Sequence, residues 1–256
     1  MRFYRSREFE ILGAESSQQA ALTWGIDMIY VLDLDGTLID SRERHYRLMQ
    51  EILSDMASMR RFDPTEFMEY KADGHSGLQY LTDRLGFPED TAKRLMALWR
   101  QQIEEERWLA LDVLYPDTLE FLERLKQKHI KMYYLTARQN REGLLHELDR
   151  LQIAGYADEV LVVSPARAGE EKKQAVETIL GKTGEDAEQV CIVGDTENEY
   201  RLAEELSLPR FLLNRGFRSE KYWMERGVES MESLCGIENY KSREGKERRF
   251  NGKKGK

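Results

Sequence analysis

The residues with the clearest chemical potential are two aspartates, Asp33 and Asp35, in the segment IYVLDLDGTLID at residues 29–40. An apolar run precedes them and a Gly-Thr turn follows, so the sequence predicts a buried strand that ends in a charged loop. Alternate residues of an extended segment point the same way, which lets both carboxylates share one site. Carboxylates act as covalent nucleophiles in phosphoryl transfer and as ligands of Mg²⁺. A solvated acidic loop is the alternative interpretation.

Further polar residues follow other apolar runs along the chain. KMYYLTAR at 131–138 ends its apolar run at Thr136, and VCIVGDTENEYRLAEEL at 190–206 releases Asp195 after a buried strand and places Glu199 at a helix start. A helix-capping role is the alternative for Thr136, and also for the two acids because carboxylates near a helix N-terminus are stabilised by its dipole. In a parallel sheet the carboxyl ends of the strands form the ligand-binding edge, which favours a shared site.

This ordered set resembles the haloacid dehalogenase-like hydrolases, a superfamily of mostly Mg²⁺-dependent phosphatases with a Rossmann-like core. The resemblance implies that Asp33 is the nucleophile and Asp35 the general acid and base. It implies that Thr136 binds phosphate. Ala137 and Arg138, which follow it, are expected to add phosphate or substrate contacts. It also implies an Mg²⁺ site made by Asp33, the backbone carbonyl of Asp35, Asp195 and Glu199, although Glu199 stands where an Asp is usual and favours holding a lysine or a metal-bound water.

The same resemblance implies a lysine that neutralises charge at the nucleophile. Lys172 and Lys173 both open the helix KKQAVETIL. Positions 172, 176 and 179 share one helix face, and Val176 and Ile179 are apolar, so the spacing favours Lys172. Two solvated surface lysines are the alternative.

Two histidines are candidate substrate contacts. DSRERHYRL at 40–48 resembles the opening of sugar-phosphate phosphatases and phosphoglucomutase-like members, which implies that His45 lies near Asp35. KADGHSG at 71–77 falls where relatives carry a substrate-reading loop, so His75, Ser76 and Lys71 are expected to contact the leaving group. A surface helix position for His45 and a plain interhelix turn for His75 are the alternatives.

Five strand candidates, at 28–34, 131–136, 159–164, 190–194 and 210–213, alternate with amphipathic helices. This pattern predicts an α/β fold, a Rossmann-like three-layer parallel sheet. Apolar helical stripes predict a small inserted helical cap at 41–113, and the core at 28–40 and 114–240. Residues 1–27 are expected to form an extension and 241–256 a basic, disordered tail.

Composition sets the outer limits. The 256 residues have 41% hydrophobic content, a net charge of −8 and two cysteines, and no run is long and apolar enough to span a bilayer. We therefore expect a cytoplasmic protein without a membrane partner, and the oligomeric state is left open. Nucleic acid is a less favoured partner, suggested by the basic tail.

The expected function is Mg²⁺-dependent hydrolysis of a small phosphorylated metabolite through an aspartyl-phosphate. The resemblance, through its Asp-x-Asp pair, argues against dehalogenation and phosphonate cleavage. A phosphomutase of the β-phosphoglucomutase type and a nucleotide or nucleic-acid 3′-phosphatase are the alternative enzymes. A non-enzymatic binding module is the alternative from another class.

Overall fold

The structure, a computed structural model, describes residues 28–54 and 62–237. The extension expected at 1–27 and the tail expected at 241–256 lie outside the described residues.

A parallel five-stranded sheet forms the centre of the molecule, in the order β5-β4-β1-β6-β7. Its strands agree with the predicted ones to within one or two residues at each end. Buried and mostly apolar residues fill the three central strands β4, β1 and β6, as expected for a parallel sheet covered on both faces. The predicted α/β fold is confirmed. The strands are β1 (Ile29–Leu32), β4 (Met132–Ala137), β5 (Glu159–Val163), β6 (Val190–Gly194) and β7 (Arg210–Leu212).

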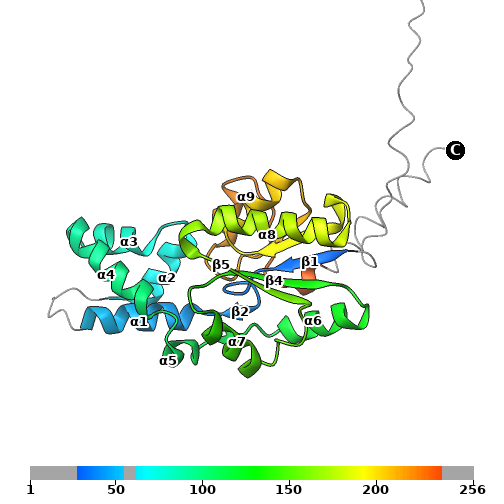
Figure 1. Ribbon diagram of the computed structural model, residues 1–256. Helices are drawn as coiled ribbons and strands as arrows, with labels where there is room; N and C mark the ends of the chain where they lie inside the picture. The colour runs from blue at the N-terminus through cyan, green and yellow to red at the C-terminus, as the bar shows by residue number, and fades with distance from the viewer. Residues whose placement is uncertain (1–27, 55–61, 238–256) are drawn as a thin grey trace, which may run out of the picture.

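Helices cover both faces of the sheet, which gives three layers (Figure 1). Because side chains alternate along a strand, Tyr30 and Leu32 of β1 join one apolar cluster with α6 and α7, and Ile29 and Val31 join another with α8 and α9. These helices are α6 (Thr118–Gln127), α7 (Arg141–Arg150), α8 (Ala168–Thr183) and α9 (Glu197–Leu206).

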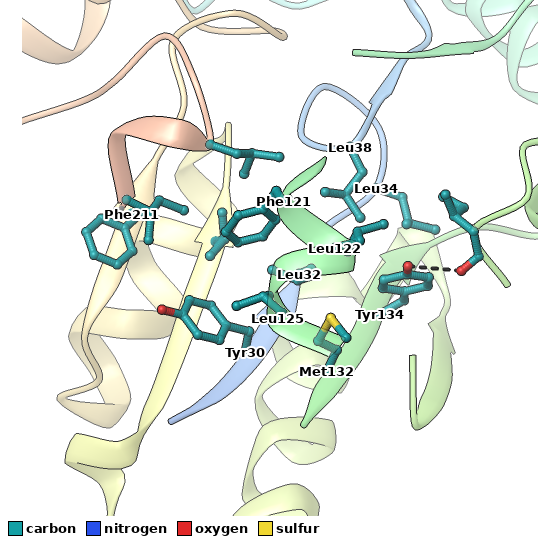
Figure 2. Close-up of a cluster of buried hydrophobic side chains, with 14 of the residues drawn as sticks. Tyr30, Leu32, Leu34, Leu38, Phe121, Leu122, Leu125, Met132, Tyr134 and Phe211 are labelled. Atoms are coloured by element: carbon teal, nitrogen blue, oxygen red, sulfur yellow. Dashed lines mark hydrogen bonds between the residues drawn. The ribbon is translucent and has the colours of Figure 1, made fainter. Parts of the chain in front are cut away.

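The first of these clusters shows how the central strand β1 is held (Figure 2). Phe121 and Leu122 of α6 pack over Leu32, and Tyr134 of β4 lies beside them. The buried hydroxyl of Tyr134 donates a hydrogen bond to the carbonyl of Ile153, 3.0 Å away, so its burial leaves no unpaired donor. Dense apolar packing on both sides fixes β1 and therefore the start of the loop that follows it.

A helical segment interrupts the chain between two short strands, β2 (Ile39–Asp40) and β3 (Val113–Leu114), which pair antiparallel. Two-residue strands have too few positions to show a period of two, so the sequence did not predict them. Figure 1 shows the helices of this segment gathered to one side of the sheet layers. The segment contains α1 (Arg42–Ser54), α2 (Pro64–Ala72), α3 (Gly77–Gln79), a π-helical turn (Tyr80–Arg84), α4 (Glu89–Gln102) and α5 (Glu106–Leu109).

This segment has an apolar cluster of its own, to which Leu48, Phe67, Tyr80 and Trp108 belong. Its helical stripes therefore face one another, as their 3.6-residue period predicts. The remaining short elements are α10 (Glu220–Met224) and 3₁₀ turns at Pro165–Arg167 and Ala187–Gln189. None of the helices within residues 28–54 and 62–237 combines the length and the apolar character needed to cross a bilayer.

Candidate active site

Three neighbouring strands bring polar side chains to one edge of the sheet. β1 lies between β4 and β6, and directly after its last residue the N–H of Asp33 donates to the Val193 carbonyl of β6, 2.9 Å away. Asp195 follows β6 and is fully buried, and Thr136 is buried near the end of β4. Asp33 itself is 9% exposed. The sheet order therefore places Asp33, Thr136 and Asp195 at the ends of adjacent strands.

The turn after β1 is tight and depends on a glycine. The carbonyl of Leu34 accepts hydrogen bonds from the N–H groups of Thr37, Leu38 and Ile39. Gly36 has φ +79°, and a Cβ added there would lie 2.2 Å from Oδ2 of Asp195. A left-handed conformation and this close approach both require glycine. The turn is thereby packed directly against Asp195.

Lys172 reaches this site from α8. Val176 and Ile179, one and two turns later, are buried under the sheet, and the same helix face carries the buried Lys172. Its Nζ donates to Oδ1 of Asp33 at 2.8 Å and to Oε1 of Glu199 at 2.6 Å. Burial opposes its charge, but the carboxylates of Asp33 and Glu199 raise the pKa of Lys172 above its ordinary value. Lys173 instead pairs with Glu205 at the surface, 3.2 Å away.

Asp33, Asp195 and Glu199 form a buried acidic cluster in which one oxygen of each lies within 4.8 Å of the others. Burial raises the pKa of Asp33 to about 7, Lys172 opposes the rise, and Glu199 adds to it. Burial also raises the pKa of Asp195 well above its ordinary value, and the charge of Asp33 adds to that rise. Two crowded, desolvated carboxyl groups of this kind are stabilised as anions by a cation placed between them.

The free oxygens of the cluster show where a cation fits. Oδ2 of Asp195 accepts the N–H of Phe217 at 2.6 Å, whereas Oδ1 is buried without a hydrogen-bond partner. Glu199 uses both oxygens, because Oε1 accepts from Lys172 and Oε2 accepts from the Thr196 hydroxyl at 2.6 Å. Oxygen ligands of this type suit Mg²⁺. The residues present fit such an ion at Asp33 and Asp195, with Glu199 holding Lys172.

Asp35 lies between two buried arginines. Arg138, just past β4, donates Nε to Oδ2 at 2.7 Å and Nη2 to Oδ1 at 2.9 Å, and Arg44 of α1 also donates to Oδ1. Although burial opposes it, Arg138 and Arg44 hold the pKa of Asp35 below its ordinary value. The side chain of Asp35 is 19% exposed, so it lies at the boundary of the site. Asp35 is therefore a carboxylate in this arrangement.

The two arginines extend this contact into a buried network. Nε of Arg44 lies 3.1 Å from Oδ2 of Asp112, and Nη2 of Arg138 lies 3.2 Å from Oε2 of Glu147. The network connects Asp35 to four parts of the chain. These are α1 with Arg44, the residue before β3 (Asp112), the residue after β4 (Arg138) and α7 with Glu147. Sequence reasoning singled out Arg138 and missed Arg44, Asp112 and Glu147. Their long separation along the chain leaves no local pattern.

His45, the histidine expected near Asp35, contacts two aromatic rings and a lysine. The side chain that reaches Asp35 from α1 is that of Arg44, one residue before His45. The ring of His45 lies 4.6 Å from that of Phe217 and 5.0 Å from that of Trp99, and its Nδ1 is 2.8 Å from Nζ of Lys71. Burial, reinforced by the charge of Lys71, lowers the pKa of His45 well below its ordinary value. His45 therefore acts as a neutral partner of Lys71.

Lys71, in the last turn of α2, lies against the core residues Phe217 and Arg218. Its Nζ lies 4.4 Å from the centre of the Phe217 ring, and burial lowers its pKa to about 7, with the positive charge of Arg218 adding to the effect. The turn is docked on the core: Nη1 of Arg218 donates to the Lys71 carbonyl, and the N–H of Ser219 donates to the Ala72 carbonyl, both at 3.0 Å.

His75, in the turn after α2, stacks on Tyr70 of that helix. Their ring centres are 4.0 Å apart and their planes differ by 14°. This contact lies within the helical segment. The charge of Lys71, at the end of α2, interacts with Asp195 and Asp35. Ala137 ends β4 and is half-buried beside Thr136.

Comparisons with known proteins agree with this arrangement. A phosphoglycolate phosphatase from Aquifex aeolicus (strain VF5) is 28% identical over 171 residues, which cover 66% of this chain and 76% of that protein. A haloacid dehalogenase-like hydrolase from Streptococcus pneumoniae superposes with a TM-score of 0.67 at 17% identity, covering 83% of this chain and 97% of that one. A predicted phosphoglycolate phosphatase from Haemophilus somnus superposes with a TM-score of 0.62 at 17% identity, covering 85% and 99%.

The family model of the haloacid dehalogenase-like hydrolases matches residues 28–206. That range contains both acid-bearing strand ends, Lys172 and the helical segment between β2 and β3. The resemblance that the sequence motifs suggested is therefore confirmed, as is the expectation of an enzyme. The chain belongs to the haloacid dehalogenase-like hydrolase family.

Proposed function

We propose that this protein is an Mg²⁺-dependent phosphatase that hydrolyses a small phosphomonoester through an aspartyl-phosphate on Asp33. The observation that carries the proposal is the position of Asp33, which is held by Lys172 at 2.8 Å and lies beside the unpartnered Oδ1 of Asp195. A nucleophilic carboxylate, a cation that neutralises charge and an oxygen ligand for a metal are thus brought together. Phosphoryl transfer depends on this positioning and charge stabilisation.

Each residue has a proposed role in the reaction. A carboxylate oxygen of Asp33 attacks phosphorus, and the bond from phosphorus to the leaving-group oxygen breaks. Lys172 keeps Asp33 ionised and balances charge on the phosphoryl oxygens, and Thr136 binds one of those oxygens. Asp33, the Asp35 carbonyl and Asp195 would hold Mg²⁺, which supplies positive charge to the phosphoryl group when bound.

Asp35 handles the protons. A protonated Asp35 gives its proton to the leaving oxygen, and the resulting carboxylate takes a proton from the water that attacks the aspartyl-phosphate. That attack releases phosphate and restores Asp33. The contacts with Arg44 and Arg138 favour the carboxylate form, which suits the second half of the cycle. To donate a proton in the first half of the cycle, Asp35 must first lose its contacts with Arg44 and Arg138 and become protonated.

The substrate is proposed to be a small phosphorylated metabolite. The names of the Aquifex aeolicus and Haemophilus somnus proteins support a phosphorylated small acid as a candidate. The helical segment at 41–113 is proposed to be a cap, because Lys71 and Ala72 dock on the core beside Phe217. A cap in this position excludes water and brings its own side chains to the leaving group.

Phosphate release from a panel of phosphorylated metabolites tests the proposal. EDTA should abolish release, and added Mg²⁺ should restore it. Ca²⁺ should inhibit, because its larger and more flexible coordination allows Asp33 to bind through both oxygens and lose its line of attack. Asp195→Asn should raise the Mg²⁺ concentration needed for half-maximal activity, whereas Asp40→Asn, on a surface pair with Arg42, should leave it unchanged. Undiminished phosphate release in EDTA would contradict the proposal.

A further inference from the structure

The loop that follows β7, residues 214–218, lies directly against the acidic cluster. Its residue Phe217 donates its N–H to Oδ2 of the buried Asp195 at 2.6 Å. This bond engages one oxygen and leaves Oδ1 free. The loop therefore decides which oxygen of Asp195 faces the acidic cluster.

The backbone of this loop touches both the aspartate and the nucleophile turn. A Cβ added to Gly216 would lie 2.1 Å from Oδ2 of Asp195 and 2.6 Å from Cα of Gly36. Such contacts leave no room for the loop to move inward. A small outward displacement of the loop, however, would break the Phe217 bond.

Arg215 restrains the loop against that displacement. Its side chain is 9% exposed, and its guanidinium donates Nη1 to Oδ1 of Asp117 and Nη2 to the Thr37 carbonyl, both at 2.6 Å. The guanidinium also lies over the ring of Tyr115, 4.1 Å from its centre, and the Tyr115 hydroxyl donates to the Arg215 carbonyl at 3.1 Å. One side chain thus ties the loop to the nucleophile turn and to the start of α6.

Little packing supports the outer side of the loop. Asn214, Arg215, Gly216 and Arg218 all line a cavity of about 840 Å³. A loop bordered by open space on that side relies on its tethers for its position. Arg215 is the tether that joins the loop to two other parts of the core, because its planar guanidinium contacts both Asp117 and the Thr37 carbonyl.

We propose that Arg215 is a positioning residue for the metal site: by fixing the 214–218 loop, it holds the Phe217 N–H on Asp195 and so orients the free Oδ1 toward the ion. This inference rests on the proposed Mg²⁺-dependent function. Groups that orient a metal ligand without touching the metal commonly change metal affinity by about 10–100-fold when they are removed.

Direct Mn²⁺ binding to metal-free protein, followed by the electron paramagnetic resonance signal of free Mn²⁺, tests this role without measuring activity. Arg215→Met should weaken Mn²⁺ binding by about 10–100-fold. Arg210→Met is a matched control, because Arg210 pairs with Glu204 at 2.6 Å and lies over Tyr200 at 4.7 Å, but at the opposite end of β7. Both variants should lower the thermal midpoint, and Arg210→Met should retain wild-type Mn²⁺ affinity.

Arg215→Lys keeps a charge beside Asp117 but lacks the planar guanidinium. It should fold and bind Mn²⁺ with an affinity between those of the wild type and Arg215→Met. This variant replaces Arg215→Met in the test if Arg215→Met does not fold. Wild-type Mn²⁺ affinity in a folded Arg215 variant would overturn the inference and leave the phosphatase proposal intact. Equal weakening by Arg210→Met would also overturn it. Mn²⁺ binding to the wild type that Asp195→Asn does not change would overturn both the metal proposal and this inference.

Discussion

Lys172 is the side chain that allows two buried carboxylates to lie close together. Its amine contacts both Asp33 and Glu199, and no more than 5% of its side chain is exposed. Removing one partner of a buried charge pair leaves the other charge desolvated, which costs far more than losing a surface pair. The adjacent Lys173 has the same chemistry in a solvated setting, 39% exposed. Comparing substitutions of the two lysines therefore distinguishes the effect of losing a buried charge from the effect of losing an exposed one.

Lys172→Met should abolish phosphate release and lower the free energy of unfolding by about 3–5 kcal/mol. Lys173→Met should keep full activity and change that free energy by about 0–1 kcal/mol. Urea denaturation at constant pH and a phosphate-release assay measure both quantities. Similar effects from the two substitutions would contradict the assignment of Lys172 to the site.

Sequence patterns located the residues whose positions depend on single elements. Asp33 and Asp195 follow apolar strands, so their positions at the ends of the adjacent strands β1 and β6 could be predicted. Lys172 was distinguished from Lys173 by the apolar helix face that it shares with Val176. These are local properties of a strand or a helix, which a period in the sequence reveals.

Pairings between distant elements could not be found in this way. Arg44 contacts Asp112, and Arg215 contacts the Thr37 carbonyl, across long stretches of chain that carry no shared period. His45 was expected near Asp35, and the direct contact with Asp35 is made by the preceding residue, Arg44. Which of two successive helix residues faces a site depends on how the helix docks, and docking is set by tertiary packing.

The buried network between α1, β4 and α7 should make stability depend on pH through Asp112. Burial raises its pKa to about 9, against the opposing charge of Arg44. The folded protein therefore keeps this proton up to about pH 9, whereas an unfolded aspartate loses it near 4. Folding binds the extra proton between these values, so this contribution to stability falls as pH rises across that window.

Asp112→Asn removes the titrating group and keeps its shape. Its thermal midpoint should fall less than that of the wild type between pH 5.5 and pH 8.5. Asp149→Asn, at an exposed position on α7, should follow the wild-type dependence. A wild-type pH slope in Asp112→Asn, measured by differential scanning calorimetry, would show that Asp112 is not the group responsible.

At the scale of the whole molecule, the helical segment and the core meet at the catalytic edge. Lys71 and Ala72 dock on Arg218 and Ser219, and Phe217 of the same core loop holds Asp195. The fold thus connects the segment that is proposed to read the substrate with the loop that orients a metal ligand. Lys71 is a charged side chain of the segment at this junction, 4.4 Å from the centre of the Phe217 ring.

Lys71→Met should lower kcat/KM for an anionic metabolite by roughly 10–100-fold, the range of a lost hydrogen bond to a charged group. The pKa of Lys71 is lowered to about 7, so its charge is present below that pH and lost above it. The difference from wild type should therefore be largest near pH 6 and decline toward pH 9. His75→Ala, which loses a stack on Tyr70 within the helical segment, should change kcat/KM little. An equal loss of kcat/KM at every pH would show that Lys71 acts through the stability of the fold and not through its charge.

The central claim is that an aspartyl-phosphate forms on Asp33, and chemical trapping tests it most directly. Borohydride reduces an aspartyl-phosphate to homoserine, which peptide mass spectrometry detects at the modified position. During turnover with Mg²⁺ and a phosphorylated substrate, homoserine should form at position 33, and it should be absent with EDTA and in the folded Asp33→Asn variant. Active turnover with no homoserine at position 33, or with homoserine at another carboxylate instead, would contradict the mechanism.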